Sequence, residues 1–482
     1  MAAIKLIGLF LCLLGTTVFA TTRSPRLGSD PEFCNLQQLT STQPAQRLEF
    51  EGGSIETWDE NDEQFRCLGV APSRKTIQPN SLSLPSFHPF PRLVFIEQGE
   101  GIIGLQIPGC AEMFDTGVDQ QQMQQRQPRR MREQGQQGEQ EISGDVHQKV
   151  HRFRQGDIIA IPAGALHWTY NDGNQEVVAI IVDDINNPAN QLDFQPRIFH
   201  LAGGISSQHV QGQQGGRRRS DPSRRGQQGS LNVENIYAGF DTDLLAEAFN
   251  SDPQIIRALQ QSSDRGLIVR VQQPMEFVTP EEEQDQSRQR QRRSGGGPAS
   301  NGIEEKICSS KIFYNLDNQR EADIFSRQAG KLNLVNEHKL PILSYMDMSA
   351  EKGHLQQNAL LSPHWEINGH TVVYVLRGEA QVEVVSNNGE PVLNEQVSRG
   401  DIFVVPQFFA TTARAGQNGF EWVAFKTNKS PMKSPVAGYT SVFRAMPLEV
   451  ITNAYDVSPS QAQSLKINRE SESLLFSPQR SY

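Results

Sequence analysis

Asn301 and Gly302 lie where a protease could cut this chain. They follow a run of small and polar residues from Ser294 to Pro298, and flexible polar stretches of this kind are preferred sites of proteolytic nicking. An Asn-Gly pair alone is weak evidence, because it is also common in hairpin turns. With Cys308 close behind and a polar linker in front, the pair becomes a strong prediction of a processing site.

Residues 1–20 predict a cleaved secretory signal. Lys5 precedes an apolar run from Leu6 to Leu14, and Val18-Phe19-Ala20 places small residues where a signal peptidase reads the chain. A transmembrane helix needs about 20 apolar residues, and this run is shorter. We therefore expect the secretory route and no membrane partner.

The cysteines predict two disulfide bonds. Cys12 is removed with the signal, which leaves an even number of cysteines: Cys34, Cys67, Cys110 and Cys308. The secretory route is oxidising, so these cysteines can pair. Four cysteines allow three pairings, and the sequence does not choose among them. The short loop from Cys34 to Cys67 is the simplest pairing and leaves Cys110 for Cys308.

Charge and motifs exclude several classes of function. The net charge of −10 argues against a nucleic-acid partner, because binding phosphates requires a basic surface. The basic run at 217–219 lies in a Gln/Gly tract and is interpreted as solvated loop charge. The chain has no Gly-x-Ser-x-Gly nucleophile motif and no evident Ser, His and Asp arrangement.

The elements that would position any site come in two copies of one module. Each copy begins with an apolar strand that ends in Gly-Glu. A segment that starts with Gly-Asp and ends in Pro comes next, and then a segment with an acidic residue shortly before a proline that begins a helix. The paired segments, in the same order, are 93–100 with 372–379, 156–162 with 400–406, and 248–253 with 454–459.

Three tracts rich in Gln, Gly and Arg interrupt this pattern, at 120–140, 205–230 and 280–297. They contain few apolar side chains and cannot offset an ordering entropy of roughly 1–2 kcal/mol per residue, so we expect disordered loop insertions. The predicted organisation is an N-terminal module at 21–279, a linker at 280–301 and a C-terminal module at 302–482.

Each module predicts a mainly β unit followed by helices. Short Val, Ile and Phe runs between turns indicate a sandwich or barrel. Apolar residues at helical spacing then predict helix pairs at 241–249 and 253–259, and at 447–454 and 459–465. We interpret each pair as an arm for subunit docking; the alternative is that it covers the open end of its own barrel.

Five residues of the first module match the second sequence signature of the cupin superfamily: Gly156, Pro162, Gly164, His167 and Asn171. In the second module two residues match, Gly400 and Pro406, and three depart, Phe408, Thr411 and Ala415. The chain thus resembles cupins, which implies two jelly-roll β-barrels, a bicupin.

The residues where cupins hold a metal argue against one here. A cupin metal centre needs three His and a carboxylate, whereas this chain offers Ser86, His88 and Arg92 with His167 in one module and His364, Glu366 and Thr371 in the other. Arg92 would place a cation where a metal needs an anion. We expect no metal, no cofactor and no catalytic residue, and interpret His167 as a packed, hydrogen-bonded residue.

The narrower resemblance, along almost the whole chain, is to the 11S (legumin-type) seed storage globulins, through the segment Asn301 to Cys308. It implies cleavage between Asn301 and Gly302 by an asparaginyl endopeptidase. It also implies acidic and basic chains joined by Cys110–Cys308, with Cys34–Cys67 inside the acidic chain.

The same resemblance implies a nutrient reservoir in the seed storage vacuole, assembly as trimers and then hexamers, and allergenicity. Three alternatives stay open: a metal-dependent germin-like oxidase, a cupin that binds a small ligand, and a vicilin-type globulin.

Overall fold

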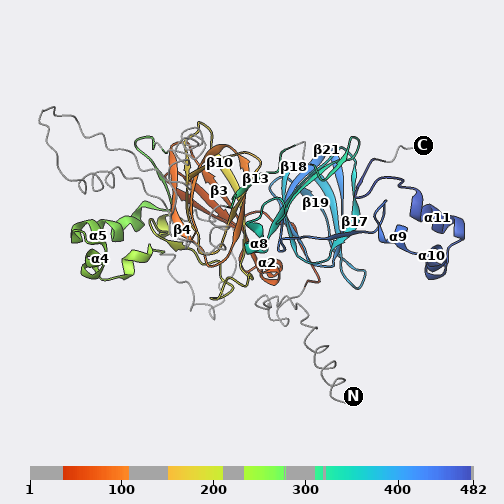
Figure 1. The fold of residues 1–482 in the computed structure, drawn as a ribbon, viewed down its shortest axis with the longest axis horizontal. Coiled ribbons are helices and arrows are strands. Elements are labelled where there is room, and N and C mark those ends of the chain that lie inside the picture. The colour runs from red at the N-terminus through yellow and green to blue at the C-terminus, as the bar shows by residue number, and fades with distance from the viewer. Residues whose placement is uncertain are drawn as a thin grey trace, which may run out of the picture.

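The computed structural model describes residues 36–107, 150–209, 233–275, 277, 310–318 and 322–478. It contains two β-barrels side by side, and helices extend from opposite ends of the molecule (Figure 1). The predicted signal, the tract at 120–140 and the linker at 280–301 lie outside the described residues.

The tract at 205–230 enters the described residues only at its start. Ile205 forms a β-bridge with Val233, and the 3-10 helix η2 (Ser207–His209) follows. The predicted disorder is therefore wrong for these first residues, because a backbone partner beyond the tract holds them.

The first barrel consists of a seven-stranded and a six-stranded sheet, all pairs antiparallel. The larger sheet has the order β1 (Gln46–Phe50), β2 (Gly53–Thr57), β3 (Val70–Ile77), β10 (Val177–Asp184), β5 (Arg92–Gln98), β8 (Asp157–Ile161), β13 (Phe313–Asn315). The smaller has the order β11 (Phe199–His200), β4 (Ser81–Phe87), β9 (Leu166–Asn171), β6 (Glu100–Gln106), β7 (Val150–Arg154), with β12 (Ile268–Arg270) paired to β4.

The second barrel repeats this arrangement as one ten-stranded sheet. Its long strands β18 (Thr371–Val385) and β21 (Ala410–Lys426) pair with each other through register shifts. Each of them corresponds to two consecutive strands of the first barrel. The others are β14 (Ile324–Ser326), β15 (Gly330–Val335), β16 (Ser349–Leu355), β17 (Leu360–Glu366), β19 (Pro391–Ser398), β20 (Ile402–Val405), β22 (Lys433–Pro435) and β23 (Leu475–Phe476).

Each repeated sequence block supplies core strands. The block at 156–162 contains β8, whose five residues are all buried, and its counterpart contains the equally buried β20. A single apolar cluster runs through both barrels, from Leu39 to Leu475. The apolar runs predicted as strands therefore form one continuous core.

The turn after the Gly-Asp block has the same backbone in both modules despite different residues. Gly164 has φ +74° in the first, and Phe408 has φ +66° in the second. Only glycine adopts this left-handed region without steric cost. The second module thus keeps the turn although phenylalanine replaces the glycine of the cupin signature, and the backbone of Phe408 is strained as a result.

The predicted helix pairs are present within about two residues of their expected ends. The first arm contains α4 (Thr242–Phe249) and α5 (Pro253–Gln260), and the second contains α10 (Leu448–Tyr455) and α11 (Pro459–Ile467). Asp252 accepts a hydrogen bond from the backbone N–H of Gln254, and Pro253 begins the helix, as expected of this pair. Shorter helices are η4 (Ile236–Gly239), η5 (Gln261–Arg265) and α9 (Val442–Ala445).

Both arms extend outward, beyond the outer ends of the two barrels (Figure 1). Large apolar side chains stay exposed on them, with Leu244 and Ile255 at 57% and Leu465 at 53%. The arms therefore carry apolar surface that the described part of the chain does not cover. No helix among the described residues is long and apolar enough to cross a bilayer.

The two modules exchange strands where they meet. Strand β13, which follows the predicted processing site, pairs with β8 of the first barrel. In return, Thr42 of the first module and Ile402 of the second exchange backbone hydrogen bonds of 2.8 and 2.9 Å. Short helices α2 (Glu63–Leu68) and α8 (Leu343–Met346) lie in the same central region (Figure 1). The boundary at Asn301 in the sequence is thus not the boundary between the barrels.

Candidate functional site

The structure places the cupin ligand positions at equivalent points of the two barrel interiors. Ser86 on β4 pairs with His167 on β9, and His364 on β17 pairs with Thr411 on β21. Likewise Arg92 on β5 pairs across to Asp183 on β10, and Thr371 on β18 pairs across to Lys426 on β21. The motif residues that the sequence singled out therefore converge as expected.

Arg92 in the first barrel is neutralised by Asp183 rather than by a ligand. Its Nε and Nη2 donate hydrogen bonds of 2.8 Å to the two carboxylate oxygens of Asp183, and both side chains are buried. A bidentate pair of this kind satisfies the planar fork of the guanidinium. The position that would hold the carboxylate of a metal centre is occupied by a complete ion pair.

The histidines beside this pair are buried and neutral. The rings of His88 and His167 lie with centroids 5.1 Å apart. Burial lowers the pKa of each well below the ordinary imidazole value, and the charge of Arg92 lowers it further. Nδ1 of His167 lies 3.3 Å from the carbonyl oxygen of Ala165, as expected for a packed residue.

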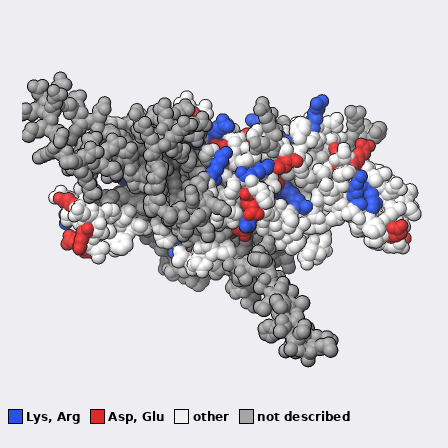
Figure 2. Space-filling model, in the orientation of Figure 1, with Lys and Arg blue, Asp and Glu red and all other residues white. Residues whose placement is uncertain are grey.

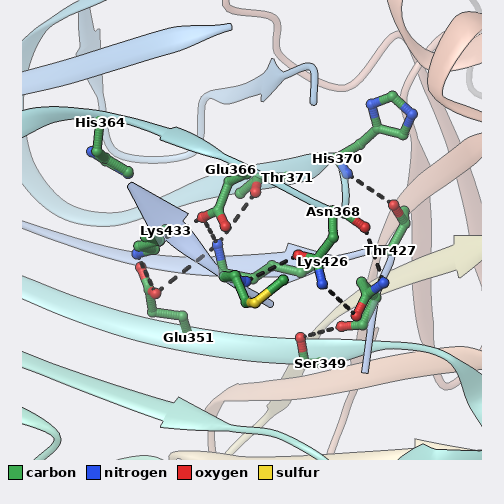
Figure 3. A network of polar contacts seen from close by, with 12 residues as sticks. Ser349, Glu351, His364, Glu366, Asn368, His370, Thr371, Lys426, Thr427 and Lys433 are labelled. Carbon is green, nitrogen blue, oxygen red and sulfur yellow. Dashed lines mark hydrogen bonds and ion pairs between the residues drawn. The ribbon is translucent and has the colours of Figure 1, made fainter. Parts of the chain in front are cut away.

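The second barrel interior contains a network of lysines and carboxylates (Figure 3). Lys426 donates to Glu366 and, at 3.3 Å, to the hydroxyl of Thr371. Lys433 forms an ion pair with Glu351, whose carboxylate is also 4.0 Å from Lys426. Each buried charge in this network thus has an opposite charge beside it.

The ion pairs of this network set its protonation. Burial would raise the pKa of Glu351, but Lys433 and Lys426 outweigh it and lower the pKa to about 2. Burial, aided by the charge of Lys433, lowers the pKa of His364 to about 4. Glu351 is therefore ionised and His364 is neutral near pH 7.

Sequence reasoning missed four of these charged residues: Asp183, Glu351, Lys426 and Lys433. Asp183 is the next-to-last residue of β10 and Lys426 is the last residue of β21, and each follows a run of apolar residues. A charge at the end of a buried strand needs a partner, and that signal could have identified both.

The residues at these positions do not fit a metal ion. The first barrel offers two neutral histidines beside an Arg-Asp pair, and the second offers carboxylates already bound by lysines. Among the described residues, no group of three His, Cys, Asp or Glu side chains gathers in a way that could hold a metal.

Of the residues predicted to form disulfide bonds or the processing site, only Cys67 lies within the described residues. Cys67 lies in α2 and is disulfide-bonded. Cys34, Cys110, Cys308, Asn301 and Gly302 lie outside the described residues. The pairing of the cysteines and the processing site stay predictions.

Comparison with known proteins gives the family. A family model described as cupin matches residues 39–212 and 314–463. The 11S globulin seed storage protein 2 of Sesamum indicum is 49% identical over 480 residues, covering 99% of each chain.

Two solved structures share the fold. The coconut allergen cocosin is 37% identical with a TM-score of 0.74, covering 92% of this chain and 99% of that one. Procruciferin, an 11S globulin from Brassica napus, is 36% identical with a TM-score of 0.74, covering 94% of this chain and 99% of that one. This duplicated barrel protein therefore belongs to the 11S, legumin-type seed storage globulins of the cupin superfamily.

Proposed function

We propose that this seed storage globulin is a nutrient reservoir without catalytic activity. The observation that carries the proposal is the pairing of Arg92 with Asp183 and of Lys426 with Glu366 inside the two barrels. These pairs occupy the positions where a cupin enzyme would place metal ligands. Nitrogen-rich Gln and Arg tracts outside the repeated strands suit a protein that is stored and later degraded.

The proposed route begins with the signal at residues 1–20 and ends in the protein storage vacuole. There an asparaginyl endopeptidase cuts between Asn301 and Gly302, giving an acidic and a basic chain. Cys110 and Cys308 join the two products, and Cys34 pairs with Cys67 inside the acidic chain. The disulfide of Cys67 supports a covalent framework of this kind.

Backbone hydrogen bonds between the two modules support the proposal that the two cleavage products stay together. Leu39 and Thr42 bind the second barrel through N–H groups 2.8 Å from the carbonyl oxygens of Val392 and Ile402. On the other side, the N–H of Ala160 in the first barrel is 2.7 Å from the carbonyl oxygen of Ile312. A cut at Asn301 would therefore leave each product bound to the other.

Assembly into trimers is proposed to use the helical arms. Exposed Leu244, Ile255 and Leu465 give both arms apolar surface, and exposed apolar patches on soluble proteins mark interaction sites. In the proposed sequence the uncut linker at 280–301 covers one face of the trimer. Cleavage then lets two trimers stack into a hexamer.

Charge on the described surface does not suggest a nucleic-acid partner. On the face shown in Figure 2, acidic and basic side chains are interspersed over the described residues near the middle of the molecule. Such mixing gives no basic stripe on that part of the surface, and the net charge is −10.

Processing is tested by incubating the purified precursor with an asparaginyl endopeptidase. The wild type should give two chains that separate on a denaturing gel only after reduction, and Asn301→Ala should stay whole. Asn388→Ala is a matched control, because Asn388 precedes Gly389 in the exposed turn between β18 and β19 and should not affect cleavage. Cleavage of the Asn301→Ala protein, or hexamers formed without cleavage, would contradict the proposal.

The oxidase alternative is tested by metal analysis of protein purified from its natural source. Stoichiometric manganese or iron would favour that alternative, and we expect neither, because the ion pairs leave no free carboxylate at these positions.

A further inference from the structure

Three Asn-Gly pairs lie in the described part of the chain, and their surroundings differ. They are Asn368-Gly369, Asn388-Gly389 and Asn418-Gly419. An asparagine amide can react with the backbone nitrogen of the next residue, and glycine has no side chain to shield that nitrogen. The reaction needs an asparagine side chain that is free to turn and a following peptide that is free to move.

Asn368 is held in the polar network of the second barrel (Figure 3). Its Nδ2 donates to the carbonyl oxygen of Ser430 at 2.7 Å, and its Oδ1 accepts a hydrogen bond from the N–H of Met432 at 3.0 Å. A Cβ on Gly369 would meet the Cβ of Asn428 at 3.1 Å, so the following peptide is closely packed as well. The fold therefore protects this amide.

Asn418 is exposed, but the peptide that follows it is enclosed. Gly419 is buried within β21, and the next residue, Phe420, pairs with Leu355 on β16 and with Gly378 on β18. A Cβ on Gly419 would lie 2.9 Å from the carbonyl oxygen of Leu355. The neighbouring strands thus restrict the movement that the reaction needs.

Asn388 and Gly389 lie in the exposed turn between β18 and β19. None of the described atoms is within 4 Å of the place where a Cβ of Gly389 would lie. The N–H of Gly389 donates to the carbonyl oxygen of Ser386 at 3.1 Å, and a single bond in an exposed turn opens at little cost. This pair has both the space and the freedom to react.

The amide of Asn388 is also polarised by two hydrogen-bond donors. Its Oδ1 accepts a hydrogen bond from the N–H of Glu390 at 3.2 Å and another from the hydroxyl of Ser386. When a nitrogen attacks Cγ, negative charge develops on Oδ1, and donors already directed at that oxygen stabilise it. The turn thus presents an activated amide beside an unshielded nitrogen.

We propose that Asn388-Gly389 is a site of spontaneous deamidation. The backbone nitrogen of Gly389 loses its proton to solvent and bonds to Cγ of Asn388, and the side-chain nitrogen takes up a proton and leaves as ammonia. Water then opens the resulting succinimide at either carbonyl, which gives aspartate or isoaspartate. Water is the only co-reactant, and the reaction depends neither on the storage function nor on processing at Asn301.

The products disturb a contact between the two modules. Nδ2 of Asn388 donates to the carboxylate of Glu390 at 2.8 Å, and deamidation replaces this attraction with repulsion between two carboxylates. Isoaspartate also adds a carbon atom to the backbone of the turn. Val392, at the start of β19, accepts a hydrogen bond of 2.8 Å from the N–H of Leu39. Deamidation therefore loosens the attachment of Leu39 to the second barrel.

The test is to age the purified full-length protein in neutral buffer and to map its peptides by mass spectrometry. Asn388 should be converted at least about tenfold faster than Asn368 and Asn418, a ratio that corresponds to about 1.4 kcal/mol in the reaction barrier. Labelling with a protein isoaspartate methyltransferase should detect isoaspartate in place of Asn388. Equal rates at the three pairs, or aspartate without isoaspartate, would overturn the proposal.

Two controls separate the effect of the fold from that of the sequence. Asn387 is exposed in the same turn but precedes Asn388 instead of glycine, so it should stay intact. In urea-unfolded protein the three Asn-Gly pairs should react at similar rates, because the protection of Asn368 and Asn418 is lost. A difference that persists in urea would contradict the structural explanation.

Variants test the activation of the amide. Ser386→Ala removes one donor from Oδ1 and should slow deamidation about threefold or more, the effect of one solvent-exposed hydrogen bond. Ser344→Ala, which removes another exposed serine hydroxyl, is the matched control and should leave the rate unchanged. An unchanged rate in the Ser386→Ala protein would contradict the role of this hydroxyl.

Hydrogen exchange tests the consequence for the module contact. The amide of Leu39 should exchange faster in aged than in fresh protein. Asn388→Gln keeps a side-chain amide but lengthens the side chain, so it should prevent both the modification and the faster exchange. Unchanged exchange at Leu39 after complete deamidation would refute the effect on the contact.

Discussion

Arg92 and Asp183, 91 residues apart in the chain, form a buried two-hydrogen-bond ion pair at the position where a cupin metal centre would have its carboxylate. The pair explains how an arginine is tolerated in a barrel interior. It also couples the stability of the first barrel to both residues, because neither charge can be buried alone.

Asp183→Asn should destabilise the protein strongly. It leaves the guanidinium of Arg92 buried without a counter-charge, which typically costs about 3–5 kcal/mol. Urea unfolding followed by fluorescence would measure the loss. The double variant Arg92→Met, Asp183→Leu should recover much of it, since an apolar pair of similar volume removes the uncompensated charge.

The control for this experiment is Arg197→Met. Arg197 and Asp193 form an exposed pair, at 53% and 40% exposure, so its loss should leave the unfolding midpoint almost unchanged. Equal effects of Asp183→Asn and Arg197→Met would contradict the assignment of the buried pair.

Stability should fall as the pH falls from about 6.5 to about 4, in part through His364. The pKa of His364 is about 4 in the folded protein, against 6.5 for a free imidazole. In this pH range the unfolded chain therefore binds a proton that the folded chain does not. For a fully buried ring, this difference lowers the free energy of unfolding by about 3 kcal/mol.

His364→Gln should flatten this pH dependence when thermal midpoints are compared between about pH 7 and about pH 4.5. His338→Gln, at an exposed position, should not. A wild-type slope retained in the His364→Gln protein would show that His364 is not a source of acid lability.

Phe408→Gly should stabilise the second barrel. Phe408 has φ +66° and is 62% exposed, so glycine would relieve left-handed strain and lose little packing. The expected gain is about 1 kcal/mol, reduced somewhat by the flexibility of glycine in the unfolded state. Differential scanning calorimetry should show a higher midpoint.

The reciprocal change supplies the comparison. Gly164 has φ +74° at the equivalent turn, so Gly164→Ala should lower the midpoint by a similar amount. If both substitutions shift the midpoint in the same direction, backbone strain is not the cause.

Cleaved and reduced protein should remain one particle in native buffer. Glu97 of the first module accepts a 3.2 Å hydrogen bond from Tyr374 and a 3.1 Å ion pair from Arg399, both of the second module. Size-exclusion chromatography of cleaved, reduced protein should therefore give a single peak containing both chains.

The contacts between the two modules can be weakened by replacing Glu97. Glu97→Ala should lower the urea concentration at which the two chains separate, whereas Glu100→Ala, at the exposed end of the adjacent turn, should not. Separation of the wild-type chains on reduction alone would show that the disulfide, not strand exchange, holds them.

An acidic residue on either arm should prevent assembly. Ile255→Asp in α5 or Leu465→Asp in α11 places a charge on exposed apolar surface that we assign to subunit contacts. Multi-angle light scattering should then report monomers. Leu192→Asp, at an equally exposed leucine outside the arms, should leave the oligomer intact, and an intact oligomer in both arm variants would exclude this docking mode.

Features encoded in consecutive residues could be predicted from the sequence. The arm helices begin where Asp252 and Ser458 cap them before a proline, and a cap and a proline act within one helical turn. The repeated apolar blocks predicted the core strands of both barrels for the same reason. The convergence of His88 and His167 followed from the cupin resemblance, which already contained the strand order.

Features that depend on distant strands could not be predicted. Asp183 meets Arg92 only because β10 lies between β3 and β5, and Lys426 meets Glu366 only when β21 and β17 close the barrel. The exchange of β13 into the first barrel crosses the predicted module boundary, and no local pattern marks it.

The amino-acid sequence by itself determined the duplicated module, the helical arms and the turns, because their signals lie within a few neighbouring residues. Only the tertiary structure decided which charges pair inside each barrel and how the two halves interlock. These outcomes depend on strand order and register across the whole sheet, where a single new neighbour changes which buried charge is compensated.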